Sequence, residues 1–366
     1  MKIIISAGGT GGHIFPAIAV ADELRQQDPS IEILFIGAVG RMEMERVPKA
    51  GYPIEGLPIA GIQRQLTFQN ILKNIQLLYK LPLSMWKVKR ILKRFKPDVV
   101  VGFGGFASGP TLKAAANQGI PTILQEQNSY AGVTNKLLAE NAKVICIAYE
   151  GMDKFFPKDK LVLTGNPVRS DILNVSAKRD EGIRYFNLDK NKKTLVILGG
   201  SLGAKTLNVA MENNAQLIES QTDMQILWQC GRLYDEDFKG GKTANLTNVQ
   251  MHPFIDRMDL AYAVADVVIA RAGALTVSEL CLAGSPSVLV PSPNVAEDHQ
   301  TKNAMALVDN KAAVLVKDKE ASEKMIVKAI ELLGNEELRH NLRDNILKLG
   351  KPNAAKDIVE AVKKVI

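Results

Sequence analysis

One pattern occurs twice in this chain of 366 residues: a short β-branched run, a glycine-rich loop and then a helical stretch. It opens the chain, with a run at 2–7, a loop at 8–13 and a helical stretch over 16–26. It returns with a run at 194–198, a loop at 199–204 and a helical stretch over 208–220. Buried parallel strands read as continuous apolar runs, and strands that alternate with helices build parallel sheets. The repeat predicts an α/β protein with two doubly wound domains.

Further apolar runs extend the pattern in both halves. We expect strands at 33–37, 98–102, 122–125 and 144–148, and in the second half at 225–228, 267–270 and 287–290. Gly165 and Pro167 break regular structure between the halves, so the predicted domains are 1–164 and 165–350. An amphipathic helix is expected at the C-terminal end, over about 351–366.

The two glycine loops favour a phosphate ligand, because a loop between strand and helix aims backbone N–H groups at a helix N-terminus. A dinucleotide fold would need a third glycine where Ile14 stands, and the run at 33–37 is not followed by an acid for a ribose. Neither loop continues into the Gly-Lys-Ser/Thr of a Walker motif. Tight turns alone could account for one such loop, and they account less well for two together with the Gly-rich turn at 102–109.

Seven segments then occur in a distinctive order. They are GGTGGH at 8–13, GGFASGP at 104–110, QEQN at 125–128, TGNPVR at 164–169, GGSLGA at 199–204, RAGALTVSE at 271–279 and EDHQTKNA at 297–304. Across almost its whole length the chain resembles the MurG family of bacterial N-acetylglucosaminyltransferases. The resemblance implies a GT-B glycosyltransferase with two Rossmann-like domains facing a cleft, and a C-terminal helix that packs back on the N-terminal domain.

The resemblance also implies an activity. Such enzymes transfer N-acetylglucosamine, with inversion, from UDP-N-acetylglucosamine to the 4-hydroxyl of the muramoyl sugar of lipid I, giving the β-1,4 linkage of lipid II. The alternative is another UDP-sugar enzyme of the same fold, a glycolipid transferase or an epimerase. No cofactor and no metal are expected. The acidic triplet 235–237 is interpreted as solvated charge in a polar loop.

Residue roles follow from the same resemblance. Glu279 would bind the ribose diol, the backbone near Ile255 would read the uracil edge, and Gln300 would contact the donor sugar with support from Asn303. His13 is the expected general base, since imidazole accepts a proton near neutral pH, and Glu126 is the second choice. The remaining residues expected near the substrates are Thr10, Gly11, Gly12, Asn128, Arg169, Ser201, Ala274, Leu275, Thr276, Val277 and Ser278.

Excess positive charge is confined to the first half of the chain. Residues 1–165 hold 20 Lys and Arg and 13 Asp and Glu, a net +7, so the remaining 46 − 20 = 26 basic and 39 − 13 = 26 acidic residues cancel. Residues 64–97 carry nine basic residues and no acid, mixed with apolar residues on either side of Pro82, which is expected to separate two helical pieces. This pattern predicts an interfacial surface for anionic lipid. Its expected members are Lys73, Ile75, Leu78, Tyr79, Lys80, Trp86 and Lys87.

Nucleic acid is a poor fit for the basic segment, because few aromatic residues accompany it and the loop motifs would be left unexplained. Three widely spaced cysteines, Cys146, Cys230 and Cys281, fit buried thiols in a reducing compartment. No apolar run reaches the roughly 20 residues that a bilayer requires, and the first residues lack the features of a signal peptide. The expected partners are the two substrates, an anionic membrane surface and other cell-wall synthesis proteins. The expected location is peripheral, on the cytoplasmic face of the plasma membrane.

Overall fold

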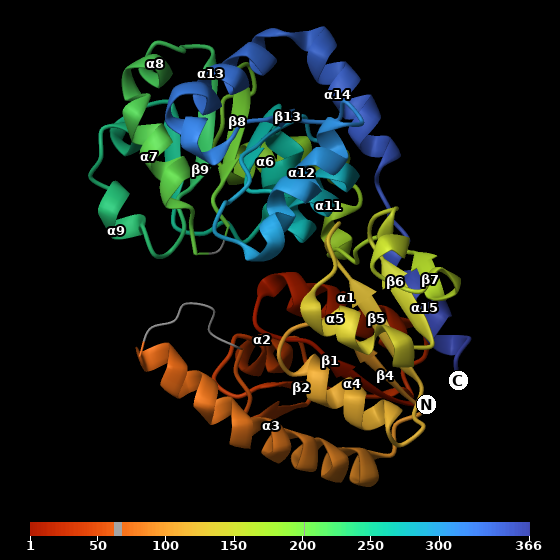
Figure 1. Ribbon diagram of the computed structural model, residues 1–366. Helices are drawn as coiled ribbons and strands as arrows, with labels where there is room; N and C mark the ends of the chain where they lie inside the picture. The colour runs from red at the N-terminus through yellow and green to blue at the C-terminus, as the bar shows by residue number, and fades with distance from the viewer. Residues whose placement is uncertain (62–67, 201) are drawn as a thin grey trace. The chain divides into compact units, whose positions relative to one another are not determined.

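The computed structural model describes residues 1–61, 68–200 and 202–366, with side chains described everywhere except at 68–78 and 296. The chain forms two compact units (Figure 1). The first comprises Met1–Arg169 and Asn353–Ile366, and the second Ser170–Pro352. The first unit runs past 164 because Asn166 stays bonded to it: its Oδ1 accepts from Gln125 and its Nδ2 donates to the Gln127 carbonyl, each at 2.9 Å.

The first unit is built on a seven-stranded parallel sheet in the order β3-β2-β1-β4-β5-β6-β7. Its order reverses at β1, which is the mark of a doubly wound fold. The strands are β1 (Lys2–Ser6), β2 (Glu32–Ala38), β3 (Ile54–Leu57), β4 (Val99–Gly102), β5 (Thr122–Glu126), β6 (Val144–Ile147) and β7 (Leu161–Leu163).

Alternate residues of these strands fill two separate hydrophobic layers. Ile4 faces one layer, whereas Ile3 and Ile5 face the other, because successive side chains of a strand point to opposite faces. Both layers exclude water, which explains why the central strands β1 and β4 are mostly apolar in sequence. The helices of this unit are α1 (Gly11–Gln27), α2 (Glu43–Lys49), α3 (Phe68–Phe95), α4 (Ser108–Ala116), α5 (Val133–Leu138) and α15 (Ala354–Lys363).

Helix α15 returns to the first unit from the far end of the chain (Figure 1). Its Ile358, Val359 and Val362 are fully buried in the same layer as Val20 and Leu24 of α1. Helices α3 and α4 supply the opposite layer. The C-terminal segment therefore completes a core that begins some 340 residues earlier, and the helix expected there is confirmed.

Two local expectations were wrong. Pro82 does not separate two helical pieces, because α3 continues through it as one helix. A proline removes a single N–H donor, which a long helix tolerates with at most a kink. The acidic triplet is not in a loop but forms the one-turn helix α9 (Asp235–Phe238), where acidic side chains favour the helix N-terminus. Over the described residues, no helix combines the length and apolar character needed to cross a bilayer.

The second unit has a six-stranded parallel sheet in the order β10-β9-β8-β11-β12-β13. Its strands are β8 (Lys193–Leu198), β9 (Met224–Gln229), β10 (Val249–His252), β11 (Val267–Ala270), β12 (Ser287–Leu289) and β13 (Val314–Leu315). Helices α7 and α13 share one core layer with this sheet. Its helices besides α9 are α6 (Arg179–Tyr185), α7 (Lys205–Asn213), α8 (Ala215–Glu219), α10 (Met258–Val264), α11 (Ala274–Ala283), α12 (His299–Val308), α13 (Ala321–Gly334) and α14 (Glu336–Lys348).

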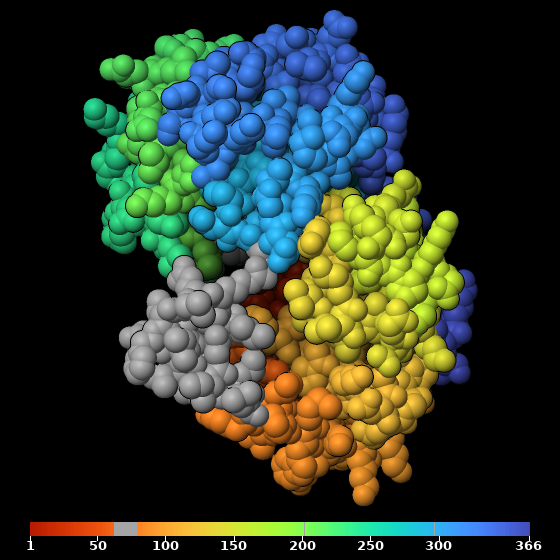
Figure 2. All heavy atoms as spheres, in the orientation of Figure 1, coloured from red at the N-terminus to blue at the C-terminus, as the bar shows by residue number. Residues whose placement is uncertain are grey.

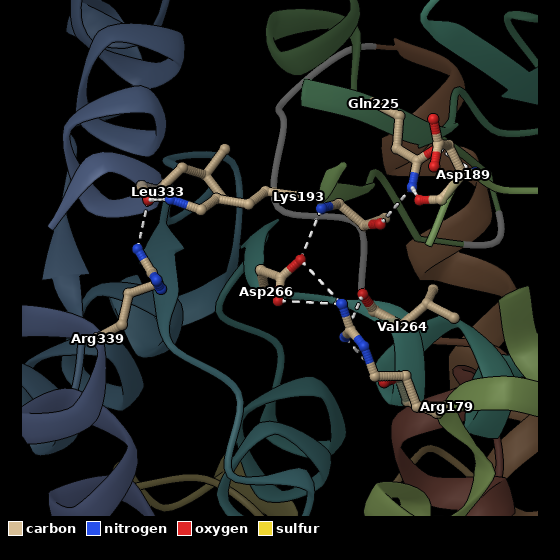
Figure 3. A network of polar contacts seen from close by, with 10 residues as sticks. Arg179, Asp189, Lys193, Gln225, Val264, Asp266, Leu333 and Arg339 are labelled. Atoms are coloured by element: carbon tan, nitrogen blue, oxygen red, sulfur yellow. Dashed lines mark hydrogen bonds and ion pairs between the residues drawn. The ribbon is translucent and has the colours of Figure 1, made fainter. Parts of the chain in front are cut away.

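A polar network ties the amino ends of β8 and β11 together (Figure 3). The Thr194 backbone N–H donates to Oδ2 of Asp266 at 2.7 Å, and Nη2 of Arg179 donates to both oxygens of the same carboxylate at 3.2 Å. Lys193 and Arg339 both donate to the Leu333 carbonyl. All of these groups lie at the amino edge of the sheet, whereas ligands of such folds bind at the carboxyl edge, so we assign the network to stability.

Candidate functional site

In the first unit the predicted residues gather at the carboxyl ends of three neighbouring strands. Strands β4, β1 and β2 pair around the point where the strand order reverses, and β5 lies next to β4. The loop after β1 carries Thr10 and leads into α1, whose first turn contains His13, and the loop after β5 carries Asn128. The sheet topology thus brings segments more than 100 residues apart to one edge, the usual binding position of this architecture.

Glycines allow two of these loops to touch through their backbones. A Cβ on Gly105 would lie 2.2 Å from the Gly8 carbonyl oxygen, which no side chain tolerates. Gly104 has φ +90°, and a Cβ there would lie 3.1 Å from the His13 ring. Ser108 fastens the junction by hydrogen bonding to the carbonyls of Ser6 and Gly104, each at 2.8 Å.

His13 lies in the first turn of α1, earlier in the helix than the predicted start at residue 16. Its Nδ1 lies 2.9 Å from the Gly8 carbonyl oxygen and 3.4 Å from the Thr10 hydroxyl. A carbonyl can only accept, so Nδ1 carries the proton of the neutral ring and Nε2 carries the lone pair. This is the tautomer that a general base acting through Nε2 requires.

Glu126 is 2% exposed and its carboxylate holds the loop that follows β5. One oxygen accepts from the Gly132 N–H and the Asn135 amide, both at 2.9 Å. The other accepts from the Asn128 N–H at 3.1 Å. Three backbone and side-chain donors therefore converge on this buried carboxylate, which gives it a role in shaping the loop.

In the second unit the predicted residues also follow the carboxyl ends of strands. Gly273 has an extended backbone and immediately precedes α11. The first N–H groups of α11, which have no acceptor within the helix, therefore lie close to the carboxyl end of β11. Ala274 and Val277 are buried, whereas Leu275, Thr276 and Ser278 are half-exposed. A ligand at this helix end would therefore meet backbone N–H groups together with the half-exposed side chains.

Glu279 lies in the second turn of α11 and has a partner that the sequence did not suggest. The hydroxyl of Tyr262, on α10, donates to its Oε2 at 2.9 Å. Tyr262 is 3% exposed, so its ring is packed in the core and its hydroxyl position is set by that packing. The carboxylate is held in one orientation, as a bidentate acceptor for a diol requires.

Gln229, at the end of β9, joins two predicted binding segments. Its Oε1 accepts from the Ile255 N–H at 2.8 Å and its Nε2 donates to the Gly200 carbonyl at 3.1 Å. Both Gln229 and Ile255 are buried. The amide thus fixes the spacing between the second glycine loop and the loop that follows β10.

The remaining residues that were predicted to lie at the nucleotide sugar, Gln300 and Asn303, are in α12. Gln300 accepts the Ser292 N–H through Oε1 at 2.8 Å, so its Nε2 is the donor end of a fixed amide. Asn303 is buried and donates to the Ala272 carbonyl at 3.3 Å, connecting α12 to the segment before α11. Arg271 donates to the carbonyl of Val290 at 2.9 Å, which ties the ends of β11 and β12.

Several predicted residues are not placed in either cluster. Ser201 and the side chains of Lys73, Ile75 and Leu78 lie outside the described part of the structure. Arg169 is half-buried at the end of the first unit. Within residues that are described, no group of three or more His, Cys, Asp and Glu could hold a metal ion.

The second half of α3 presents an exposed stripe that we call the α3 stripe: Tyr79, Leu83, Trp86, Arg90 and Lys93. These residues recur at helical spacing, and in Figure 2 the side chains of this part of the helix (orange) lie at the surface. Arg90 stacks over the Trp86 ring at 4.7 Å. Lys87 points elsewhere, because its Nζ donates to the Gly56 carbonyl of β3 at 2.7 Å.

Both halves of the chain match known protein families. Residues 3–147 match the glycosyltransferase family 28 N-terminal domain, and residues 194–362 match the glycosyltransferase family 28 C-terminal domain. The chain is 53% identical over 367 residues to the UDP-N-acetylglucosamine–N-acetylmuramyl-(pentapeptide) pyrophosphoryl-undecaprenol N-acetylglucosamine transferase of Flavobacterium psychrophilum, covering 100% of this chain and 98% of that protein. The Bacteroides fragilis protein of the same name is 51% identical, with 100% and 96% covered.

Solved structures agree with the sequence comparison. The Acinetobacter baumannii MurG crystal structure superposes with a TM-score of 0.78 at 31% identity, covering 99% of both chains. UDP-GlcNAc 2-epimerase from Neisseria meningitidis superposes with a TM-score of 0.67 at 17% identity, covering 100% of both chains, which shows a shared fold alone. The GT-B fold expected from the sequence is confirmed.

Proposed function

The chain belongs to the MurG family of UDP-N-acetylglucosamine-dependent glycosyltransferases, and from that premise we propose that it converts lipid I to lipid II. The donor is UDP-N-acetylglucosamine and the acceptor is the 4-hydroxyl of the undecaprenyl-linked muramoyl sugar. The observation that carries the proposal is the pair of preorganised clusters, Gly8–His13–Gly104 in one unit and Tyr262–Glu279 in the other.

The second unit binds the donor. Glu279 accepts both ribose hydroxyls, the Ile255 backbone reads the uracil edge, and Gln300 contacts the sugar. Helix α11 has ten residues, and its N-terminal N–H groups stabilise the negative charge that develops on the departing UDP. Catalysis by this route requires no metal, and activity should persist in excess chelator.

The first unit supplies the base. The acceptor oxygen attacks the anomeric carbon, the bond from that carbon to the UDP oxygen breaks, and the hydroxyl proton passes to Nε2 of His13. The configuration at the anomeric carbon inverts, which gives the β-1,4 linkage. Thr10, Gly11, Gly12 and Asn128 line the same edge, and Glu126 holds the Asn128 loop in place.

The first unit also meets the membrane that carries the acceptor. The α3 stripe combines exposed aromatic and aliphatic side chains with basic neighbours, as interfacial helices do. We place the enzyme peripherally on the cytoplasmic face of the plasma membrane, where it works beside other proteins of cell-wall synthesis.

The decisive experiment follows radiolabelled sugar from UDP-N-acetylglucosamine into a lipid I analogue, with UDP-glucose as a parallel donor. We expect transfer from UDP-N-acetylglucosamine alone, with loss of label from the product after a β-N-acetylglucosaminidase. Conversion of UDP-N-acetylglucosamine to its 2-epimer without acceptor would instead make the chain an epimerase. Transfer to a different glycolipid in preference to the lipid I analogue would overturn the acceptor assignment.

A further inference from the structure

A buried carboxylate lies beneath the first glycine loop and has no role in the chemistry described above. Glu43, in the first turn of α2, is fully buried. Its Oε1 accepts from the Ala38 N–H at 2.9 Å and its Oε2 accepts from the Gly9 N–H at 3.1 Å. The fit is close, since a Cβ on Gly8 would lie 2.3 Å from the Glu43 Oε1.

The Gly9 N–H and the Gly8 carbonyl belong to the same peptide group. On one side that group donates to Glu43, and on the other its oxygen accepts from Nδ1 of His13 at 2.9 Å. In a trans peptide the N–H and C=O point in opposite directions, and the described chain has no cis bonds. The peptide therefore stands between the carboxylate and the imidazole as a bridge.

Hydrogen bonds that are linked in series, as these two are through one peptide group, strengthen each other when they are buried. A carboxylate that accepts the N–H makes the carbonyl of the same peptide a better acceptor for the Nδ1 proton. Nδ1–H bonding in turn makes Nε2 more basic and stabilises the imidazolium, as a carboxylate does when it contacts a histidine directly.

We propose that Glu43 is a positioning residue that acts on His13 through the Gly8–Gly9 peptide, fixing its tautomer and increasing the basicity of Nε2. The proton from the acceptor hydroxyl goes to Nε2, while the Nδ1 proton stays in place and Glu43 remains a carboxylate throughout. This inference rests on the proposed role of His13 as base. It also has a physical purpose, because the N-terminus of α1 disfavours a cation in its first turn and a buried anion offsets that effect.

Few other polar groups face the His13 ring among the described residues. The β4–α4 loop, residues 103–107, faces His13 without a titratable side chain, and Thr10 contributes a hydroxyl. The loop after β5 contributes Glu126, whose carboxylate is occupied by its own loop. The charged neighbours of Glu43 on or next to α2 are Arg41, Glu45 and Arg46, and of these Glu45 is exposed and paired with Lys49 at 2.7 Å.

The first test uses the unsubstituted protein. ¹⁵N-histidine labelling distinguishes the two nitrogens of each ring, and a His13→Gln variant assigns the His13 signals among the four histidines. We expect neutral His13 to carry its proton on Nδ1, and the Gly9 amide signal to move as the His13 ring titrates. A neutral ring protonated on Nε2 would overturn the proposal without any variant having to fold.

The second test compares Glu43→Gln with Glu45→Gln, which removes the same charge from the exposed face of the same helix. Removing the Glu43 charge destabilises the imidazolium, so the titration midpoint of His13 should move to lower pH by about 0.5 to 1. The acidic limb of the kcat/KM profile should move in the same direction, and kcat at the optimum should fall about 3- to 10-fold. Glu45→Gln should leave both curves in place.

The outcomes separate this inference from the function on which it rests. If the Glu43→Gln midpoint coincides with that of the unsubstituted protein, the bridge has no electrostatic role and the proposal fails. If His13→Gln keeps normal kcat while Glu43→Gln still moves the midpoint, the bridge exists but His13 is not the base. A kcat that falls equally at every pH, with the acidic limb unmoved, would reduce Glu43 to a structural support.

Discussion

The Tyr262 hydroxyl holds the Glu279 carboxylate in position, so the two residues should contribute separably to binding of the UDP donor. Glu279→Ala removes the ribose acceptor and should weaken UDP binding by about 1–3 kcal/mol. Tyr262→Phe keeps the ring and loses only the hydroxyl, so its cost should be smaller, about 0.5–1.5 kcal/mol. Calorimetry with UDP and with 2′-deoxy-UDP measures both effects, and the variants should discriminate less between the two ligands. Unchanged UDP affinity in Glu279→Ala would remove this residue from the site.

His13 offers a second prediction at the level of the residue. His13→Ala should lower kcat by about 10²–10⁴, the usual contribution of a general base, with little change in UDP affinity. Steady-state kinetics with a lipid I analogue and calorimetry with UDP provide the two readouts. If kcat stays near normal, the base is elsewhere, and Glu126→Gln is the next variant, although the donors around that carboxylate argue against it.

Residues that the sequence did not single out share one property: each acts through a contact that no spacing reveals. Glu43, Tyr262 and Gln229 reach their partners across 34, 17 and 26 residues, from neighbouring elements. His13, Glu279 and Gln300, in contrast, stand inside motif segments and were therefore candidates from the sequence. Supporting residues depend on tertiary packing, which a single sequence does not display.

At the level of the element, the central strands were predictable and the outer strands were not. Strands β1, β4, β8 and β11 are mostly apolar because both of their faces are covered, and β5 has an apolar centre although it ends in the buried Gln125 and Glu126. Strands β3, β7, β10 and β13 lie next to or at the edges of the sheets and have two to four residues each. These runs are too short, and too often partly exposed, to show the pattern of a buried strand.

The ion pairs of Asp259 on α10, one of which joins α10 to the segment before α6, should make the stability of the fold sensitive to acid. Asp259 is buried and pairs with Arg257 and Lys178, each at 2.9 Å. Its hydrogen bonds to Arg257 and then Lys178 hold the pKa of this carboxyl well below its usual range. A carboxyl with a lowered folded pKa contributes stability above the unfolded value of about 4, and that stability is lost as pH falls below it.

Thermal unfolding between pH 7 and pH 2 measures this contribution. Asp259→Asn should destabilise the protein at pH 7 by about 1–3 kcal/mol, and should flatten the loss of Tm below about pH 4. Asp237→Asn, on the exposed face of α9, is the matched control and should follow the unsubstituted curve. A variant curve parallel to the unsubstituted one through pH 4–2 would show that another group governs acid stability.

At the scale of the whole molecule, the positive charge is distributed unevenly along the chain. The excess belongs to the first 165 residues, and much of it lies on α3. A soluble donor and a membrane-bound acceptor call for an enzyme that binds the bilayer through one unit and leaves it easily. Each basic group near an anionic leaflet contributes about 1 kcal/mol, within a Debye length of about 8 Å at physiological salt.

Liposome binding tests this division. Lys89 and Lys93 are exposed on α3, whereas Lys87 is best left intact because its bond to the Gly56 carbonyl holds the helix to β3. Reversing both charges with Lys89→Glu and Lys93→Glu should weaken binding to anionic vesicles by at least about 30-fold, the equivalent of two groups at about 1 kcal/mol each. Lys190→Glu with Lys319→Glu makes the same charge change on the second unit and should leave binding almost unchanged.

Binding of the unsubstituted enzyme should fall steeply as salt rises, and neutral vesicles should bind poorly. Activity on a long-chain lipid acceptor should fall with vesicle binding. Activity on a short-chain soluble acceptor should survive, because neither lysine lies near the start of α1, which carries His13, or in the loop that carries Asn128. Equal loss on both acceptors would mean that α3 supports the acceptor site itself, and equal loss of binding in the two double variants would mean that net charge, rather than this face, draws the enzyme to the bilayer.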